Sequence, residues 1–300
     1  MKQLLFLLIL IQACFPQSQI QVSLNNEKGK TNYFISESIY LKLSIVNSTK
    51  KLLEFKSEYL SKQFYIKGEN DYFLEPYLSF SNETHFHIFP SDSFVIYWDI
   101  TTAFNQGNKV KDLEYGLPPD KYVIYYKYAN DKLRLESNQL HFRVTHPPDI
   151  EKKAFDLYSQ AMQMFRDSKN KNQLQKTNAF LKVVEEYPKS VYAPSALYFA
   201  QITGADRENL GIRLINEYPS TPEIWNLLNT FMNRCKTDKN KNEAESFLRK
   251  LISNYQKTFV AKEAQNRLFE IERLSLEEWL KPELVKERKL KEYYERHLKQ

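Results

Sequence analysis

Hydrophobic and polar residues alternate along the first half of the chain. The pattern is clearest in residues 39–46, where Ile39, Leu41, Leu43 and Ile45 occupy every second position. Further short runs rich in β-branched and aromatic residues follow at 64–66, 94–98, 122–126 and 140–144. Turn-forming residues separate these runs, and no segment of helical period lies between them. We therefore predict about seven short strands in an antiparallel β-sandwich.

Three segments of this half resemble a known family. They are the opening strand 21–24, the alternating segment 39–47, and the turn and strand at 115–122. Together they resemble the immunoglobulin-like sandwiches of bacterial envelope proteins, including those akin to the intracellular proteinase-inhibitor type. Asp120 stands where such domains commonly have glycine, and aspartate tolerates turn conformations. The resemblance implies an Ig-like β-sandwich over residues 19–146, and inhibitor activity does not follow from it.

Two prolines end the strand region. Pro147 and Pro148 can neither donate to a strand ladder nor continue a helix, so residues 147–149 are predicted to be a stiff linker. Asp149 is then placed to cap a helix that runs from residue 150 to about residue 165.

Beyond the linker the period becomes helical and a sequence repeat appears. Residues 183–190, 214–221 and 251–258 align, with Tyr187, Tyr218 and Tyr255 at the same position of each copy. The tyrosines are 31 and 37 residues apart, around the roughly 34 residues of a helix-turn-helix tetratricopeptide unit. In each copy an apolar pair and the tyrosine are expected to pack at a helix end. Pro188 and Pro219 would stop the helix, and Ser or Thr would cap the next one.

The second half also resembles a family on these residues. The segment 187–198 is similar to the repeats of bacterial envelope tetratricopeptide proteins, such as outer-membrane assembly lipoproteins and division-coordinating periplasmic proteins. The resemblance spans residues 150–272 and implies binding of proteins or peptides without chemistry. Trp225 and Leu227 stand where small residues are usual, and Gln256 replaces proline, so the middle repeat is expected to be distorted. Candidate contact residues are Tyr192, Asn229 and Lys262.

The predicted fold class is therefore multidomain: an all-β Ig-like sandwich followed by an all-α tetratricopeptide-like helical repeat array. A charged tail, residues 273–300, forms one or two more helices interrupted at Pro282. Its basic and acidic residues alternate at helical spacing, which is typical of a solvated or capping helix. A role at a membrane surface or against an acidic partner is the alternative for this tail.

The N-terminus predicts export. Residues 1–18 are interpreted as a signal peptide, because one lysine precedes an apolar run too short to span a bilayer. Residues 11–14 resemble the lipobox of bacterial lipoproteins and would make Cys14 the lipidated residue, although Gln12 fits that pattern poorly. Acyl chains would then hold the protein on a membrane. In the competing interpretation, cleavage follows Ser18 and Cys14 is removed.

Composition restricts the chemistry. The chain of 300 residues has 6 glycines, which argues against Gly-rich phosphate loops. Its net charge of +6 is too diffuse to imply nucleic acid by itself, and no nucleic-acid partner is predicted. Cys14 and Cys235 are its two cysteines, so neither a structural disulfide nor a zinc cluster is expected. Cys235, next to the helical stretch 225–234, is predicted to be a buried, unreactive thiol. The glycosylation sequons at Asn47 and Asn82 are treated as chance.

Candidate catalytic chemistry is sparse. His85 and His87 would share one face of a strand, with Glu83 nearby, a geometry that can bind a metal ion. An exposed strand face beside a core Phe86 is the preferred interpretation. The pairs Glu185–Glu186 and Glu277–Glu278 are adjacent on helices, so their carboxylates diverge. We predict no catalytic residue, no metal, no cofactor and no enzymatic activity.

Three functional hypotheses result. In the first, the protein is an exported, lipid-anchored scaffold or adaptor of the bacterial cell envelope, in the outer membrane or periplasm, which binds a protein partner through its repeats. In the second, it is an inhibitor or ligand-binding module that acts through the β-sandwich. The third is a hydrolase and depends on His85 and His87 alone.

Overall fold

The computed structural model describes residues 20–26, 29–57, 63–69, 73–74, 84–104, 116–130, 132–167 and 169–297. The chain divides into two compact units. Unit 1 comprises residues 1–29, 41–98 and 121–142, and unit 2 comprises residues 30–40, 99–120 and 143–300.

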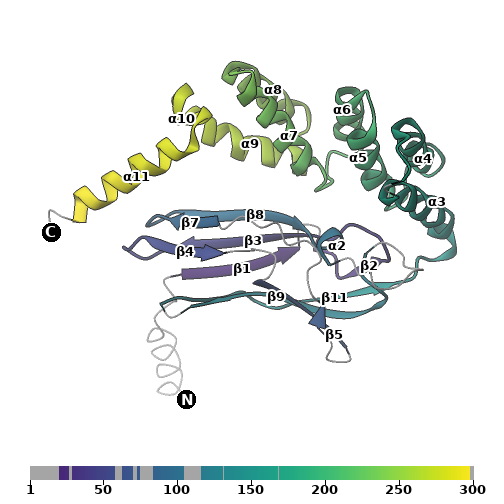
Figure 1. Cartoon of the computed structure of the whole chain (residues 1–300), viewed down its shortest axis with the longest axis horizontal. Helices are drawn as coiled ribbons and strands as arrows, with labels where there is room; N and C mark the ends of the chain where they lie inside the picture. Colours follow the sequence, from purple (N-terminus) through teal and green to yellow (C-terminus); the bar gives the residue numbers. More distant parts are fainter. Residues whose placement is uncertain are drawn as a thin grey trace, which may run out of the picture. The chain divides into compact units, whose positions relative to one another are not determined.

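Unit 1 is built from strands. The first sheet has the order β1-β3-β8, with β1 antiparallel to β3, and a second pair joins β4 to β7. The remaining strands follow the order β11-β9-β5-β6, and β10 also pairs with β9. The strands, labelled in Figure 1 where there is room, are β1 (Ile20–Asn26), β3 (Tyr40–Asn47), β4 (Leu53–Ser57), β5 (Phe64–Gly68), β6 (Phe73–Leu74), β7 (Thr84–Ile88), β8 (Ser93–Asp99), β9 (Asp120–Ala129), β10 (Arg134–Glu136) and β11 (Leu140–Thr145).

Alternation places the core of unit 1 as the sequence predicts. Leu41, Leu43 and Ile45 on β3 are buried, whereas Lys42, Ser44 and Val46 between them are partly exposed. The same alternation on β9 buries Tyr122, Ile124 and Tyr126, among other residues. Successive side chains of a strand point to opposite faces, so each of these strands contributes one apolar face.

Unit 2 joins a helical array to two segments from the strand region. Residues 30–40 contain β2 (Asn32–Phe34), which pairs in parallel with residues 143–145 at the end of β11. Residues 99–120 contain the short α2 (Ile100–Ala103). The helices of the array are α3 (Asp149–Arg166), α4 (Gln173–Glu186), α5 (Ala193–Thr203), α6 (Arg207–Glu217), α7 (Ile224–Thr237), α8 (Lys241–Asn254), α9 (Phe259–Glu272), α10 (Leu276–Leu280) and α11 (Pro282–His297).

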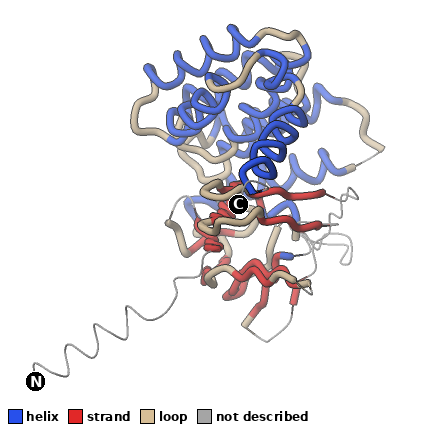
Figure 2. Tube along the Cα trace, turned by 90° about the vertical axis from the view of Figure 1, so that its left-hand side faces the viewer, coloured by secondary structure: helices blue, strands red, loops and turns tan. Residues whose placement is uncertain are grey.

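Successive helices of the array pack against one another. Contacts join α3 to α4, α4 to α5, α5 to α6 and α8 to α9, and α7 contacts both α8 and α9. Figure 1 shows these helices following one another in sequence order, and Figure 2 shows them in blue, gathered together. The apolar residues of α7 that face the core, among them Ile224, Leu228 and Cys235, recur at helical spacing.

The middle repeat accommodates its large residues by a change on the partner helix. Leu227 of α7 packs where Gly211 of α6 has no side chain, and a Cβ atom at position 211 would lie 2.9 Å from Leu227 Cδ1. The small residue is thus on α6 instead of α7. This pairing is the local adjustment to Leu227, one of the two large residues of α7 that depart from the expected pattern.

Helix boundaries follow local capping chemistry, but the cap predicted for α3 is wrong. The side chains of Asn172, Asn240 and Thr258 accept hydrogen bonds from the first turns of α4, α8 and α9. The helix predicted after the prolines is present as α3, but its N-cap residue is Pro148, which has no side-chain bond, and Asp149 is already in the first turn. The Asp149 carboxylate therefore contributes only through the helix dipole.

The predicted fold class is wrong. The sheets are mixed, because β2 runs parallel to β11, so the strands do not form a purely antiparallel Ig-like sandwich. The second unit is not an all-α array, since it includes β2 and the segment 99–120. Hydrophobic periodicity indicates whether a segment forms a strand or a helix, but not which element it packs against. It therefore did not predict that residues 30–40 and 99–120 belong with the helices.

Candidate functional site

A buried polar cluster in unit 2 joins α5 and the start of α7 to the segment 30–40. Ser195 on α5 is at its centre: its Oγ lies 2.8 Å from Ser38 Oγ and donates to Glu223 Oε1 at 2.6 Å. The Thr221 hydroxyl donates to the other oxygen of Glu223, which is only 2% exposed. Since both carboxylate oxygens accept hydrogen bonds, this buried acid is stabilised by hydroxyl groups.

The same face of α5 binds the backbone of the segment 35–39. The Tyr192 hydroxyl, next to the start of α5, donates to the carbonyl oxygen of Ile35 at 2.9 Å, and both residues are buried. No residue of α5 from Ala193 to Thr203 is exposed. The start of α5 therefore holds a turn of the protein's own chain, in which Ser36 has a φ of +63°.

Asp99 introduces a second acid beside this cluster. It is the N-cap of α2, and its carboxylate accepts a hydrogen bond from Thr101 N at 3.0 Å. Burial, and then the charge of Glu223, raise the pKa of Asp99 to about 7, although the residue keeps partial contact with solvent. This carboxyl group therefore changes its protonation near neutral pH.

The phenol of Tyr158 on α3 points to the same place. Tyr158 is fully buried, and within the described residues its hydroxyl has no partner at hydrogen-bond geometry. Burial first, and then the charges of Asp99 and Glu223, raise its pKa well above the usual value. Burial, reinforced by these two charges, keeps the phenol in its neutral form.

The hydrogen bonds of this cluster link α5 to the segment 30–40 and to the start of α7. The Ser195 proton is committed to a buried carboxylate, and Ser195 itself is only 2% exposed, so its hydroxyl cannot attack a substrate that arrives from solvent. Sequence reasoning missed the cluster because its members lie far apart in the chain. Only the Asp99-x-Thr101 pattern, typical of a helix N-cap, was readable locally.

The repeat-defining tyrosines occupy equivalent places. Tyr187, Tyr218 and Tyr255 are the C-cap residues of α4, α6 and α8, with φ of −133°, −132° and −124°. Each is followed by the same turn, because the backbone N–H of Ser190, Thr221 and Thr258 donates to the carbonyl of the preceding tyrosine at 3.0, 3.0 and 3.1 Å. The three copies thus share one helix-to-turn geometry.

These tyrosines join neighbouring repeats by hydrogen bonds, whereas the sequence suggested apolar packing. The Tyr218 hydroxyl donates to the carbonyl of Pro188 at 2.9 Å, and the Tyr255 hydroxyl donates to Asn216 Oδ1. Val260 N adds a backbone bond to the Pro219 carbonyl at 3.1 Å. All three tyrosines are only partly buried. Tyr218 and Tyr255 therefore each form a hydrogen bond to the preceding repeat.

The three candidate contact residues have different surroundings. Tyr192 is fully buried and already bonded to the segment 35–39, so the prediction that it contacts a partner is wrong. Asn229 on α7 is partly exposed and Lys262 on α9 is exposed. Asn233 and Asn266 are exposed on the same two helices. We call Asn229, Asn233, Lys262 and Asn266 the repeat face.

Other predicted residues are only partly described. Cys14, Asn82 and Glu83 lie outside the described residues, as does the side chain of His85. His87 Nε2 lies 3.3 Å from Glu54 Oε1 on the adjacent strand β4. Asn47 is buried and its side-chain nitrogen donates to the carbonyl groups of Lys51 and Ile88, which makes it a structural residue of the turn.

Cys235 and the charged tail are in the described part. Cys235 is a buried free thiol, as predicted, and burial raises its pKa. The tail forms α10 and α11, and α11 begins at Pro282. Its charges pair with one another: Arg288 lies 2.6 Å from Glu278 and 3.4 Å from Glu292. Ion pairs of this kind are typical of a solvent-exposed helix surface.

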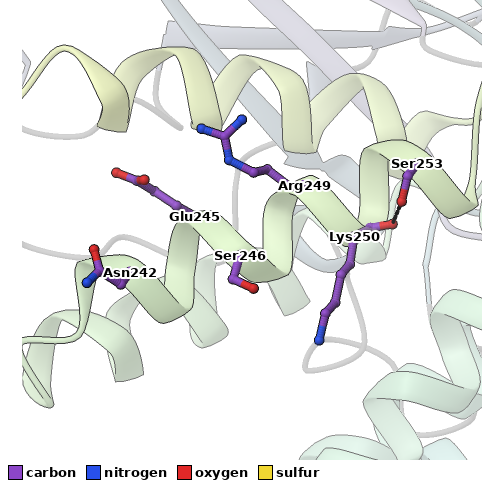
Figure 3. Close-up of a pocket in the computed structure, with 6 residues that line it drawn as sticks. All are labelled: Asn242, Glu245, Ser246, Arg249, Lys250 and Ser253. Carbon is purple, nitrogen blue, oxygen red and sulfur yellow. Dashed lines mark hydrogen bonds between the residues drawn. The ribbon is translucent and has the colours of Figure 1, made fainter.

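A shallow depression of about 530 Å³ follows the exposed side of α8 (Figure 3). Its lining comes from this one helix: Asn242, Glu245, Ser246, Arg249, Lys250 and Ser253. Glu245 pairs with Lys241, Arg249 pairs with Glu272, and Ser253 donates to the Lys250 carbonyl, so its polar groups are mostly satisfied locally. The depression offers no converging groups for a ligand.

Two kinds of feature are absent from the described residues. No group of three or more His, Cys, Asp or Glu side chains in the described ranges could hold a metal ion. No described helix has the length and apolarity needed to cross a membrane.

Comparisons with known proteins do not assign a family. No family model matches the chain, and no curated protein matches it. Among solved structures, a β-glucosidase from Listeria innocua in complex with glucose aligns over 45% of this chain and 17% of its own, at 12% identity and a TM-score of 0.27. The yjhA protein from Bacillus subtilis aligns over 39% and 83%, at 12% identity and a TM-score of 0.21. A β-glucosidase from Kluyveromyces marxianus aligns over 44% and 16%, at 13% identity and a TM-score of 0.21. Similarities this low support no conclusion about fold or activity.

Proposed function

We propose that the protein is an exported scaffold or adaptor of the cell envelope that binds a protein partner through its helical repeats and catalyses no reaction. The observation that supports this is the binding of the segment 35–39 by α5. In that contact Tyr192 recognises a backbone carbonyl and Ser195 a side-chain hydroxyl, both by hydrogen bonds. The array thus already holds one segment of polypeptide through hydrogen bonds to its backbone and to a side chain.

We place the partner protein on two of the remaining helices, α7 and α9. The face used on α5 continues towards α7, where the Asn226 side chain bonds the hydroxyl of Tyr198. Arg267 of α9 reaches the Trp225 carbonyl of α7 at 3.4 Å, so α7 and α9 are neighbours. The repeat face on these helices carries amide side chains, which can donate to and accept from a peptide backbone. We place the partner there.

Site-specific photocrosslinking in cells tests this proposal. A photoreactive residue at Asn229 or at Asn266 should yield an adduct with the same protein, because both positions lie on the repeat face. Lys250 is the matched control, since it is exposed on α8 but outside the repeat face. Adducts of equal yield from Lys250, or no adduct from either repeat-face position, would contradict the proposal.

Substitutions on the repeat face provide a second test of the proposal. The double variant Asn229→Ala/Lys262→Glu should lose co-purification of the crosslinked protein, whereas Lys250→Glu should retain it. All three residues are at least partly exposed, so the variants should keep the wild-type melting temperature. Retention of the partner by the double variant at wild-type levels would place the binding surface elsewhere.

A further inference from the structure

The turn 35–39 of unit 2 is held on one side by Asp99 and Thr101. The Asp99 carboxylate accepts a hydrogen bond from Thr101 N at 3.0 Å. The Thr101 hydroxyl in turn accepts from Ile39 N at 2.9 Å and donates to the Glu37 carbonyl at 3.0 Å. Since Thr101 is only 1% exposed, a single buried residue connects the Asp99 carboxylate to the turn.

On its other side the turn meets α5 and the start of α7. Ser38 Oγ lies 2.8 Å from Ser195 Oγ, which donates to Glu223 Oε1 at 2.6 Å. The Tyr192 hydroxyl donates to the carbonyl oxygen of Ile35 at 2.9 Å. Each side of the turn is thus linked to a carboxylate through hydroxyl groups, and these links span four separate parts of the unit.

The described titratable groups that surround Asp99 on the helices are an acid and two phenols. They are Glu223 at the start of α7, Tyr158 of α3 and Tyr198 of α5. Residues 116–119, which approach Thr101 closely at Gly116, contain no charged side chain. An ionised Asp99 therefore lies near the negative charge of Glu223, in a setting that is otherwise made of neutral groups and backbone.

The charged residues on and beside the turn have contacts of their own. The Glu37 carboxylate, on the turn, pairs with Lys30 and accepts from Phe34 N at 3.1 Å. Lys42, on the strand β3 next to β8, lies over the ring of Tyr97 at 5.4 Å from its centroid. The turn is thus a preformed unit that docks on α5, and its own ion pair moves with it.

Protonation of Asp99 sets how well the docked turn tolerates its surroundings. Burial, and then the charge of Glu223, outweigh the hydrogen bonds to Asp99, and the net result is a pKa raised from 3.8 to about 7. The protonated acid fits the docked arrangement, whereas the ionised acid favours one in which water reaches it. Because Thr101 joins Asp99 to the turn, movement of the turn away from α5 supplies that access. Docking is therefore favoured at low pH and weakens as pH rises through about 7.

We propose that the turn 35–39 is a proton-dependent latch on α5, closed while Asp99 is protonated and opened when this acid ionises near Glu223. Opening breaks the bonds that Tyr192 and Ser195 make to the turn and exposes both hydroxyl groups to solvent. The helical array thereby gains a surface on α5 that depends on pH. The inference does not depend on a partner bound at the repeat face, so either proposal can fail alone.

Hydrogen–deuterium exchange of the whole protein, measured by mass spectrometry, tests the latch. Exchange would be followed at several pH values from 5 to 8 and corrected for the intrinsic rate at each pH. Protection of the peptide 30–40 should fall about tenfold between pH 6 and pH 8, the factor expected when the pKa of Asp99 is about 7 in the closed state and 3.8 in the open state. It should stay below the protection of α4 throughout, because the latch opens without unfolding of the array.

Two variants assign the effect to one acid. Asp99→Asn stays neutral and can still accept from Thr101 N, so its peptide 30–40 should keep at pH 8 the protection that it has at pH 6. Asp167→Asn, which changes an exposed acid at the end of α3, should behave as the wild type does.

Three results would overturn the proposal. The first is equal protection of the peptide 30–40 at pH 6 and pH 8 in the wild type, a comparison that needs no variant to fold. The second is a fall with pH that Asp99→Asn retains, since another group would then be responsible. The third is equal protection of the peptide 30–40 and of α4 at every pH, because the turn would then open only when the whole unit unfolds.

Discussion

Asp99 is the residue whose chemistry most distinguishes this protein from a simple helical scaffold. Its pKa is raised from 3.8 to about 7, chiefly by burial and then by Glu223, so the folded state binds this proton more tightly than the unfolded state does. Stability should therefore be greatest at low pH, decline as pH rises from about 4 to about 7, and stay constant above that. The decline attributable to this one partly exposed group is on the order of 3 kcal/mol at most.

Asp99→Asn should remove this pH dependence. The amide stays neutral and its oxygen can still accept from Thr101 N, so the variant should melt at a higher temperature than the wild type at pH 8 and at a similar one near pH 4. Asp167→Asn is the matched control, because Asp167 is exposed and caps only its own turn. An Asp99→Asn protein with the wild-type profile between pH 5 and 8 would show that the acid is ionised throughout.

The local pattern predicted whether each element is a strand or a helix. It only partly predicted which interactions hold the elements together. The three tyrosines at equivalent positions indicated helix ends, and they are the C-caps of α4, α6 and α8. Their role was not readable, because the acceptors of the Tyr218 and Tyr255 hydroxyls lie 30 and 39 residues earlier in the chain. The Ser195–Glu223 bond was missed for the same reason.

The tyrosine bonds between repeats should contribute measurable stability. Tyr218→Phe removes the donor to the Pro188 carbonyl and should lower the free energy of unfolding by about 1 kcal/mol, or the melting temperature by about 2 °C. Tyr187→Phe is the internal control, because Tyr187 has the same backbone geometry and no preceding repeat to bond. Equal shifts in the two variants, measured by calorimetry, would mean that the bond from Tyr218 to Pro188 adds no stability of its own.

Gly116 should be the most restricted glycine in the described segments. Its φ is +110°, and a Cβ atom there would lie 2.8 Å from Thr101 Cγ2 and 3.3 Å from the backbone of Ser36. Gly116→Ala should therefore destabilise the protein by about 2 to 3 kcal/mol in urea unfolding. Gly29→Ala has a positive φ of 59° but open space around it, and it should cost only about 1 kcal/mol. A smaller loss at Gly116 than at Gly29 would contradict the close approach.

Lipidation is the prediction that belongs to the mature molecule as a whole. If Cys14 is acylated, the intact mass should begin at Cys14 with added acyl chains, and the protein should partition into detergent because buried methylenes contribute about 0.8 kcal/mol each. Cys14→Ala should lose both properties. An unmodified wild-type chain beginning near Gln19 would instead support ordinary cleavage, and the proposed adaptor would then be free of an anchor.

At the scale of the whole chain, the error in the predicted fold class has one physical origin. Residues 30–40 and 99–120 lie among the predicted strands, yet they belong to the compact unit of the helices. Ile35 and Ser38 meet α5 through Tyr192 and Ser195, across a separation of 157 residues for each bond. No periodic pattern encodes such a pairing, because the apolar residues of these segments also fit a sandwich.

This discontinuous unit leads to a prediction about fragments. A fragment of residues 150–300 contains all the repeats but lacks the segments that cover α5, a helix with Ser195 and Gln201 among its buried residues. It should unfold at a lower temperature and less cooperatively than the helical part of the intact protein, by circular dichroism at 222 nm. A synthetic peptide of residues 30–40, added in excess, should raise that temperature by mass action, whereas the same peptide with Ser38→Ala should do so less. If the fragment alone melts as the intact chain does, and neither peptide changes it, then α5 does not need the segment, and the tie through Ser195 and Tyr192 is dispensable.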